Sequence, residues 1–168
     1  MIKVIDNFLD EEEFKQLQSI VLSQGFHWQF DDCIVVPNDG QYQLTHVIFN
    51  IRYGGVHSEY YSLFDVVQQK LGVKRLDRIK LNLNPKTVFH RKGGYHCDNN
   101  LRDTYQHTKT AVLYLNTNNG WTEFKKGGRV KSIANRMVIF DSNLEHTGVT
   151  CTDKNRRVVI NFNYDGSY

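Results

Sequence analysis

The second half of the chain consists of short alternating runs of apolar and polar residues, with no helix-length pattern between them. Residues 79–84, for example, alternate isoleucine or leucine with lysine or asparagine, which is the two-residue period of a β-strand with one buried face. Turn-forming residues separate the runs, as at 118–120 and 126–128. The predicted strands are 79–84, 95–98, 110–116, 121–124, 130–133, 137–140, 145–149 and 157–164. Eight short antiparallel strands fit a double-sheet jelly roll, so a mainly β fold is expected.

An amphipathic helix is predicted close to the N-terminus. Asp10 is a favourable N-cap, and the three glutamates that follow it suit the positive end of a helix. Phe14, Leu17 and Val21 then fall on one face, and Gly25 ends the pattern. The apolar face is expected to pack on one sheet of the jelly roll.

A second amphipathic helix is predicted from about Ser58 to Gly72, where glycine provides the stop. Its apolar stripe consists of Tyr60, Leu63, Phe64, Val67 and Leu71. Between the two helices, residues 29–55 mix strand-like pieces with turn residues and are interpreted as loop and edge strand. The chain is thus expected to be one domain over 1–168, with an N-terminal helical support region (1–74) and a jelly-roll core (75–165).

Composition is that of a soluble globular protein. The 168 residues are 40% hydrophobic and 23% charged, and no apolar run approaches the ~20 residues that span a bilayer. Asp6 interrupts any N-terminal apolar stretch, so no export signal is expected. Three cysteines at irregular spacing argue against a disulfide framework and favour a reducing, cytoplasmic location. A net charge of +3 is too small to favour nucleic acid as a partner.

His96 and Asp98 form the motif with the strongest chemical implication. On a strand, residues two apart project from the same face, so an imidazole and a carboxylate would lie side by side. His146 follows from a distant strand and could complete two histidines and one carboxylate on one side of a metal ion. This facial arrangement leaves coordination positions open and is typical of non-haem Fe(II). Cys97 lies between them but is expected to face the other way, as a packed thiol.

Residues 79–164 resemble the double-stranded β-helix of the 2-oxoglutarate and Fe(II)-dependent oxygenases, in the prolyl-4-hydroxylase-like branch. The resemblance lies in the His-x-Asp at His96 and Asp98 and in His146 before the final strand. Residues 110–116 also resemble the third core strand of the family. The resemblance implies that His96, Asp98 and His146 bind Fe(II). It also implies that Tyr114 donates a hydrogen bond to the far carboxylate of 2-oxoglutarate.

The resemblance further requires a basic residue about nine to eleven positions after the distal histidine, and two arginines qualify. Arg156 and Arg157 point to opposite faces of the predicted final strand. If Arg157 faces inward, Asn161 and Asn163 do too, which suits a charged cosubstrate. We therefore choose Arg157 over Arg156 as the cosubstrate anchor.

The implied activity is that of a dioxygenase that hydroxylates a C–H bond while 2-oxoglutarate is decarboxylated to succinate. Its cofactors would be Fe(II), 2-oxoglutarate and dioxygen, with ascorbate as a candidate stimulant. The favoured substrate is a protein or peptide residue such as proline; the alternatives are a small molecule or methylated nucleobase, and a non-catalytic binding module on the same barrel. Substrate determinants are expected in residues 31–57, 86–95 and 99–107. The glycines at 93 and 94 either hinge a flap or only turn the chain toward His96.

Overall fold

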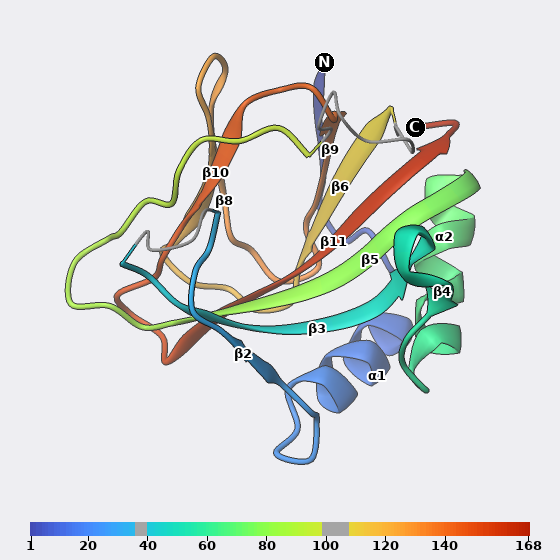
Figure 1. The fold of residues 1–168 in the computed structure, drawn as a ribbon, viewed down its shortest axis with the longest axis horizontal. Helices are drawn as coiled ribbons and strands as arrows, with labels where there is room; N and C mark the ends of the chain where they lie inside the picture. Colours follow the sequence, from blue (N-terminus) through green and yellow to red (C-terminus); the bar gives the residue numbers. More distant parts are fainter. Residues whose placement is uncertain (36–39, 99–107) are drawn as a thin grey trace.

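The computed structural model describes residues 1–35, 40–98 and 108–168, and these form two antiparallel sheets with two α-helices outside them (Figure 1). The strands of the larger sheet are β1 (Ile2–Ile5), β2 (Gln29–Asp31), β3 (Gln43–Asn50), β4 (Gly55–Val56), β5 (Val73–Pro85), β6 (Lys109–Tyr114), β9 (Met137–Asp141) and β11 (Arg156–Gly166). Their order is β1-β9-β6-β11-β5-β3-β2, with β4 beside β3. The strands of the smaller sheet, in the order β10-β7-β8, are β7 (Trp121–Phe124), β8 (Gly128–Lys131) and β10 (His146–Val149).

The helices begin and end close to the predicted positions. Helix α1 (Glu11–Val21) follows Asp10, whose backbone N–H donates to the Glu13 carboxylate at 3.2 Å. The second predicted helix starts as a 3-10 turn, η2 (Tyr61–Phe64), and becomes α-helical only in α2 (Asp65–Leu71). A further 3-10 turn, η1 (Ile51–Tyr53), precedes β4. Gly72 ends α2 at φ +62°, a left-handed conformation that glycine adopts without strain.

Both helices pack on the outer face of the larger sheet, as predicted (Figure 1). The buried helix residues are Phe14, Leu17, Val21, Phe64, Val67 and Leu71. They join alternate residues of β5 and β11, such as Ile79 and Ile160, in one apolar core. A smaller apolar cluster that includes Phe124 and Phe140 lies between the two sheets. The mainly β, two-sheet architecture with helices on one sheet is therefore confirmed, and among the described helices none is long and apolar enough to cross a membrane.

Strand β3 shows that the interpretation of residues 29–55 as loop and edge strand was only partly right. β2 does lie at the sheet edge, but β3 is an eight-residue strand paired on both sides, with β5 and β2. Its pattern is hard to recognise because Gln43 and Thr45 are polar and yet buried. Gln43 faces a polar cavity, so the strand lacks the usual alternation of apolar and polar types.

The predicted strand at 95–98 is not regular. Only one residue pair, His96 with His146, forms an isolated antiparallel bridge there, and the two residues exchange N–H···O=C bonds of 3.0 Å. Asp98 N–H then donates to Ser142 O at 3.2 Å, which takes the chain off the strand path. The segment therefore pairs with β10 only at His96. It then curves away, because the backbone N–H of Asp98 bonds to the turn between β9 and β10.

The segment between β1 and α1 is held by Asn135, in the turn before β9. Its side chain accepts from Leu9 N–H at 2.9 Å and donates to Leu9 C=O at 2.8 Å, while its own carbonyl accepts from Phe8 N–H. Asn135 also has φ +60°, in the left-handed region that asparagine tolerates better than most residues. Asn135 thus adds to the pairing of β1 with β9, which joins the start of the chain to the larger sheet.

Replacing Asn135 with alanine is expected to lower the free energy of unfolding by about 2–4 kcal/mol, because buried backbone groups lose partners and the left-handed residue is strained. Glycine tolerates the conformation, so Asn135→Gly should cost less, about 1–3 kcal/mol. Chemical denaturation measures both. The exposed Asn143 is the control, and Asn143→Ala should stay within about 0.5 kcal/mol of the parent. Equal effects at the two positions would contradict this account.

Candidate active site

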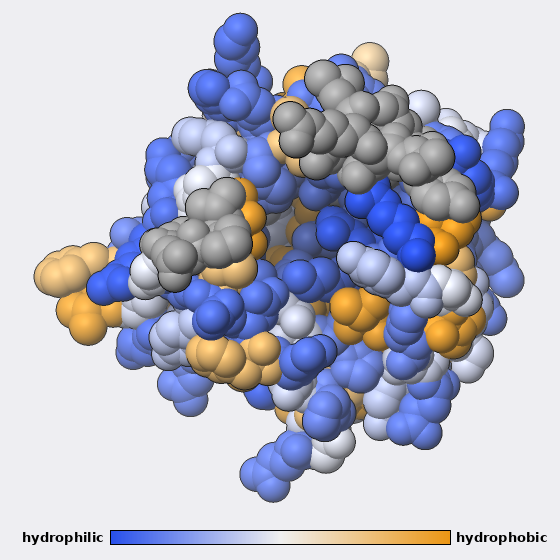
Figure 2. All heavy atoms as spheres, in the orientation of Figure 1, coloured by the Kyte–Doolittle hydropathy of each residue, from blue (hydrophilic) through white to orange (hydrophobic). Residues whose placement is uncertain are grey.

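A polar cavity of about 330 Å³ opens between the two sheets. Its floor is formed by alternate residues of β5 and β11, the same strands whose other faces contact the helices. Figure 2 shows hydrophilic side chains around the hollow on this face of the molecule. The polar residues of the floor are Arg78, Lys80, Asn82, Asn84, Arg157 and Asn161. A cavity lined in this way suits a charged ligand better than an apolar one.

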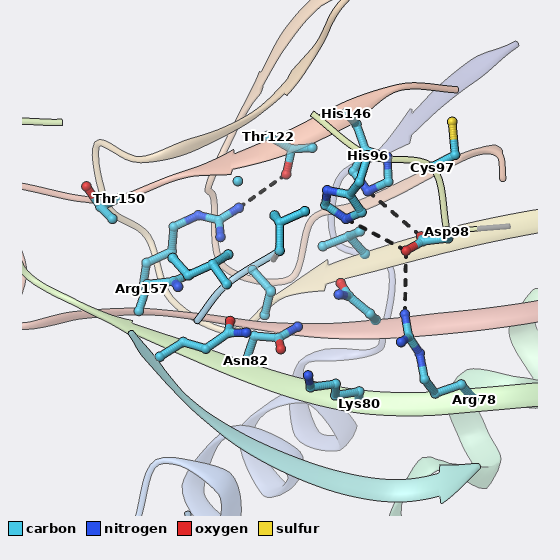
Figure 3. Close-up of a pocket in the computed structure, with 18 residues that line it drawn as sticks. Arg78, Lys80, Asn82, His96, Cys97, Asp98, Thr122, His146, Thr150 and Arg157 are labelled. Atoms are coloured by element: carbon cyan, nitrogen blue, oxygen red, sulfur yellow. Dashed lines mark hydrogen bonds and ion pairs between the residues drawn. The ribbon is translucent and has the colours of Figure 1, made fainter. Parts of the chain in front are cut away.

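His96, Asp98 and His146 meet at one end of this cavity (Figure 3). The Nε2 atoms of His96 and His146 lie 3.9 and 3.8 Å from the Asp98 carboxylate, and the two imidazole centroids are 4.6 Å apart. Asp98 and His146 have 5% and 8% of their side chains exposed, whereas His96 is 35% exposed. The structure thus brings together the three residues that the sequence singled out, and one side of the group faces the cavity.

Backbone carbonyls determine which imidazole nitrogens face Asp98. His96 Nδ1 lies 3.2 Å from Gly94 O and His146 Nδ1 lies 3.0 Å from Leu144 O. Since a carbonyl oxygen only accepts, each Nδ1 carries a proton, and the neutral tautomer with this proton presents its Nε2 lone pair on the side of the carboxylate. Burial also lowers the pKa of His146, which favours its neutral form. Two lone pairs and a carboxylate that face one another need a cation between them, so the donor set fits a divalent metal ion.

Asp98 is held in its ionised form by three neighbours. Thr110 Oγ1 donates to Asp98 Oδ2 at 2.6 Å, Asn163 Nδ2 donates to the same oxygen at 3.2 Å, and an Arg78 nitrogen lies 3.5 Å from Oδ1. Burial alone would raise the pKa of Asp98, but the charge of Arg78, the proximity of His146 and the Thr110 hydrogen bond lower it to about 2. The carboxylate is therefore available as a ligand at neutral pH, and its orientation is fixed by outer contacts.

Arg157 occupies the opposite end of the cavity in Figure 3 and is 2% exposed. Its Nε donates to Ser132 Oγ at 3.0 Å and one terminal nitrogen donates to Thr122 Oγ1 at 3.2 Å. Among residues 1–35, 40–98 and 108–168, no carboxylate lies within ion-pair distance of this guanidinium. A buried cation without a counter-charge is costly, so the geometry fits an anionic ligand that enters from the cavity.

The predicted register of the final strand is confirmed. Arg157 and Asn161 line the cavity, and Asn163 contacts Asp98, while Val158 and Ile160 pack toward the helices. Arg156 points away from the cavity, where it donates to Leu22 O at 2.8 Å. The two neighbouring arginines therefore lie on opposite faces of β11.

Glycine at position 120 leaves the space in which Arg157 lies. A Cβ atom there would be 2.9 Å from Arg157 Cδ and 2.7 Å from the Val149 carbonyl oxygen. Both separations are too short for real contacts, so any larger residue at Gly120 would displace the arginine or the backbone of β10.

Tyr114 lies behind the cavity wall, which differs from the direct contact expected of it. Its hydroxyl donates to Thr122 Oγ1 at 2.7 Å, and the Arg157 guanidinium lies 5.6 Å from the centre of its ring. Thr122, not Tyr114, lines the cavity. Because the Thr122 oxygen accepts from both Tyr114 and Arg157, its own proton remains free to donate to a ligand. Thr122 is a site residue that the sequence did not identify, since its strand was predicted but its direction was not.

The structure also tests the predictions made for Cys97 and for the glycines before His96. The Cys97 thiol donates to Asn143 O at 3.1 Å, and Figure 3 shows its sulfur directed away from the Asp98 carboxylate. Gly93 N–H donates to Gly148 O at 3.2 Å, so this glycine is paired with β10, which supports the turn interpretation over the hinge. The loop 99–107, expected to carry substrate determinants, lies outside the described residues.

Solved structures with the same fold are prolyl hydroxylases among others. A prolyl-4-hydroxylase from Pseudomonas putida is 17% identical, covers 99% of this chain and 93% of its own, and has a TM-score of 0.65. A prolyl hydroxylase from Trichoplax adhaerens, in complex with a hypoxia inducible factor oxygen degradation domain peptide fragment, is 17% identical over 98% and 83% of the two chains, with a TM-score of 0.64. The viral collagen prolyl hydroxylase of Paramecium Bursaria Chlorella virus-1, in its 2OG complex, is 13% identical over 99% and 96%, with a TM-score of 0.64.

At these identities the structural matches establish the fold, and no curated protein matches the sequence. The family follows from the sequence match. A family model described as the 2OG-Fe(II) oxygenase superfamily matches residues 82–165, which are 84 of 168 residues. This range includes the two histidines, Asp98 and Arg157. The chain therefore belongs to the 2OG-Fe(II) oxygenase superfamily, whose members are oxidoreductases that use Fe(II), 2-oxoglutarate and dioxygen.

Proposed function

We propose that this protein hydroxylates a residue of a protein or peptide, such as proline, with His96, Asp98 and His146 as the Fe(II) ligands and Arg157 as the anchor of 2-oxoglutarate. The observation that carries the proposal is the pair of complementary ends of one cavity. One end offers three metal-ligating atoms, and the other offers a buried guanidinium without a carboxylate partner among the described residues. A dicarboxylate that binds a metal through one end and a cation through the other matches both.

The protein groups orient and hold the reactants. Arg157 and the Thr122 hydroxyl bind the far carboxylate, and Tyr114 supports Thr122 from behind. Thr110 and Asn163 keep the Asp98 carboxylate directed at the metal position. When bound, Fe(II) and 2-oxoglutarate supply the oxidation, in which one oxygen atom of O2 enters the substrate C–H bond, the other enters succinate, and carbon dioxide is released.

A protein or peptide substrate is supported by the surface beside the cavity. Val88 and Phe89 are 84% and 79% exposed, on the segment between β5 and His96. Thr87 Oγ1, next to them, lies 2.6 Å from Thr150 Oγ1, and Thr150 lines the cavity. Two large exposed apolar side chains next to an entrance are typical of a contact surface. Structures of the same fold include the Trichoplax adhaerens enzyme with its peptide fragment. The three free thiols support a reducing compartment such as the cytoplasm.

Turnover without a defined substrate tests the activity first. Purified protein with Fe(II), ascorbate and 2-oxoglutarate is expected to form succinate, and heat-denatured protein is the control. Panels of proline-containing peptides, free amino acids and methylated nucleosides, examined by mass spectrometry for the gain of one oxygen atom, then identify the substrate class. Absence of succinate would favour a non-catalytic binding module, and oxidation of nucleosides alone would refute the peptide proposal.

His96→Ala and Asp98→Ala are expected to abolish succinate formation and to weaken Fe(II) binding by more than about 100-fold, because loss of an outer partner of a ligand already costs 10–100-fold. Anaerobic calorimetry measures the affinity. The fold should persist, since the site is open to the cavity and is not a structural staple. His57→Ala is the matched control, because this histidine is exposed and lies outside the cavity. Metal affinity that is unchanged in Asp98→Ala would contradict the assignment.

Arg157→Ala is expected to raise the apparent KM for 2-oxoglutarate by more than about tenfold, because a charged hydrogen-bond partner contributes about 1.5–3 kcal/mol. Arg156→Ala is the control and should have little effect, since Arg156 contacts Leu22 on the other face of β11. Thr122→Val should impair 2-oxoglutarate binding more than Tyr114→Phe does, if Thr122 makes the direct contact. Equal effects of the two arginine variants would refute the anchor.

A further inference from the structure

Strand β5 directs two cations, Arg78 and Lys80, into the cavity, and neither is needed for 2-oxoglutarate in the proposed function. They are two residues apart and so project from the same face of the strand. Their side chains are 33% and 22% exposed, which leaves them within reach of a ligand. Figure 3 shows both below the metal-ligating group and separate from Arg157.

The charges around the cavity explain why these two cations need a partner. Fe(II) with two positive charges, Asp98 with one negative charge and Arg157 with one positive charge give a net charge of about +2. The two carboxylates of 2-oxoglutarate neutralise this charge. Arg78 and Lys80 then remain. Lys80 Nζ has one weak partner, Asp31, whose carboxylate oxygen is 3.7 Å away. Within the described residues, the Arg78 guanidinium contacts only Asn163 and Asp98, and Asp98 is already engaged by the metal position.

The position of Arg78 limits what the missing anion can be. Its terminal nitrogen lies 3.5 Å from the Asp98 carboxylate, so an anion bound there lies within a few ångströms of the metal ligands. The C–H bond to be oxidised must reach the same region. Since one residue spans about 3.8 Å of chain, an anionic group on the oxidised residue or on an adjacent one can reach this position.

We propose that Arg78 and Lys80 form a carboxylate-binding subsite, so that the substrate carries a carboxylate within one residue of the carbon that is hydroxylated. A carboxylate matches two adjacent cations and the amide groups of Asn82 and Asn161 beside them. It can come from a free α-carboxyl group or from an acidic side chain next to the target residue. The inference rests on the proposed function, because it assumes that Fe(II) and 2-oxoglutarate occupy the rest of the cavity.

Lys80 gives the cleaner test of the two. Arg78 also contacts Asp98 and Asn163, so its replacement disturbs the metal-ligating group as well. Lys80 contacts neither histidine nor Asp98 among the described residues. Lys74, an exposed lysine on the same strand outside the cavity, is the matched control, because Lys74→Gln and Lys80→Gln change the net charge equally.

The experiment compares carboxylate and amide pairs by calorimetry, with Fe(II) and 2-oxoglutarate bound under anaerobic conditions so that no turnover occurs. One arm uses Nα-acetyl amino acids, proline included, against their amides. The other uses blocked tripeptides in which glutamate or glutamine follows the target residue. At least one carboxylate member is expected to bind about tenfold or more tightly than its amide, as a charge-assisted hydrogen bond allows. The arm that shows this preference identifies the source of the carboxylate.

In Lys80→Gln the preference is expected to fall toward equality, whereas Lys74→Gln keeps it. Circular dichroism confirms that each variant is folded. No carboxylate preference in any pair, or a preference that persists in Lys80→Gln, would overturn the subsite. Succinate formation by the parent protein separates the two levels. A protein that forms succinate but shows no preference refutes the subsite alone, and one that forms no succinate refutes the proposed function.

Discussion

The antiparallel pairing of β5 with β11 is the interaction on which the rest of the structure depends. From Asn84 opposite Arg157 to Arg78 opposite Asn163, the two strands run in continuous register through the centre of the larger sheet. Because side chains alternate, one face presents isoleucine, leucine, valine and phenylalanine to the helices, and the other presents arginine, lysine and asparagine to the cavity. A slip of one residue would bury the charges under the helices and empty the site.

This division explains why the polar floor can exist in a folded protein. The larger apolar core lies under the helices and stabilises the sheet from that side, and the cavity side adds only the smaller cluster between the sheets. Charged groups on the other face donate hydrogen bonds, such as those from Arg78 to Asn163 and from Arg157 to Ser132. Their remaining donors are available to a ligand. Protein stability is thus concentrated on one side of the sheet and ligand recognition on the other.

Much of the fold and of the metal-ligating group could be predicted from the sequence because both depend on local patterns. Alternation along β5 and β11 gave the strands, and the spacing of His96 and Asp98 indicated a metal site. Alternation alone left both faces of β11 open, and the inward direction of Arg157 was chosen from the resemblance and from Asn161 and Asn163 on the same face. The alternation failed at β3, where Gln43 is buried against the cavity and Thr45 is buried elsewhere, and at 95–98, where the chain follows one bridge and then curves. Thr110 and Thr122 could not have been assigned, because a threonine in a strand has no signal of its own. Their roles arise only when distant strands bring a carboxylate or a guanidinium within hydrogen-bond distance.

The reciprocal backbone bonds between His96 and His146 have a consequence for metal affinity. These residues are fifty positions apart, and in a flexible chain an ion that joined them would have to close that loop against chain entropy. Here the main chain has already closed it through two N–H···O=C bonds of 3.0 Å. An arriving ion therefore meets two imidazoles whose separation folding has set in advance, and its binding free energy is not reduced by the entropy of bringing them together.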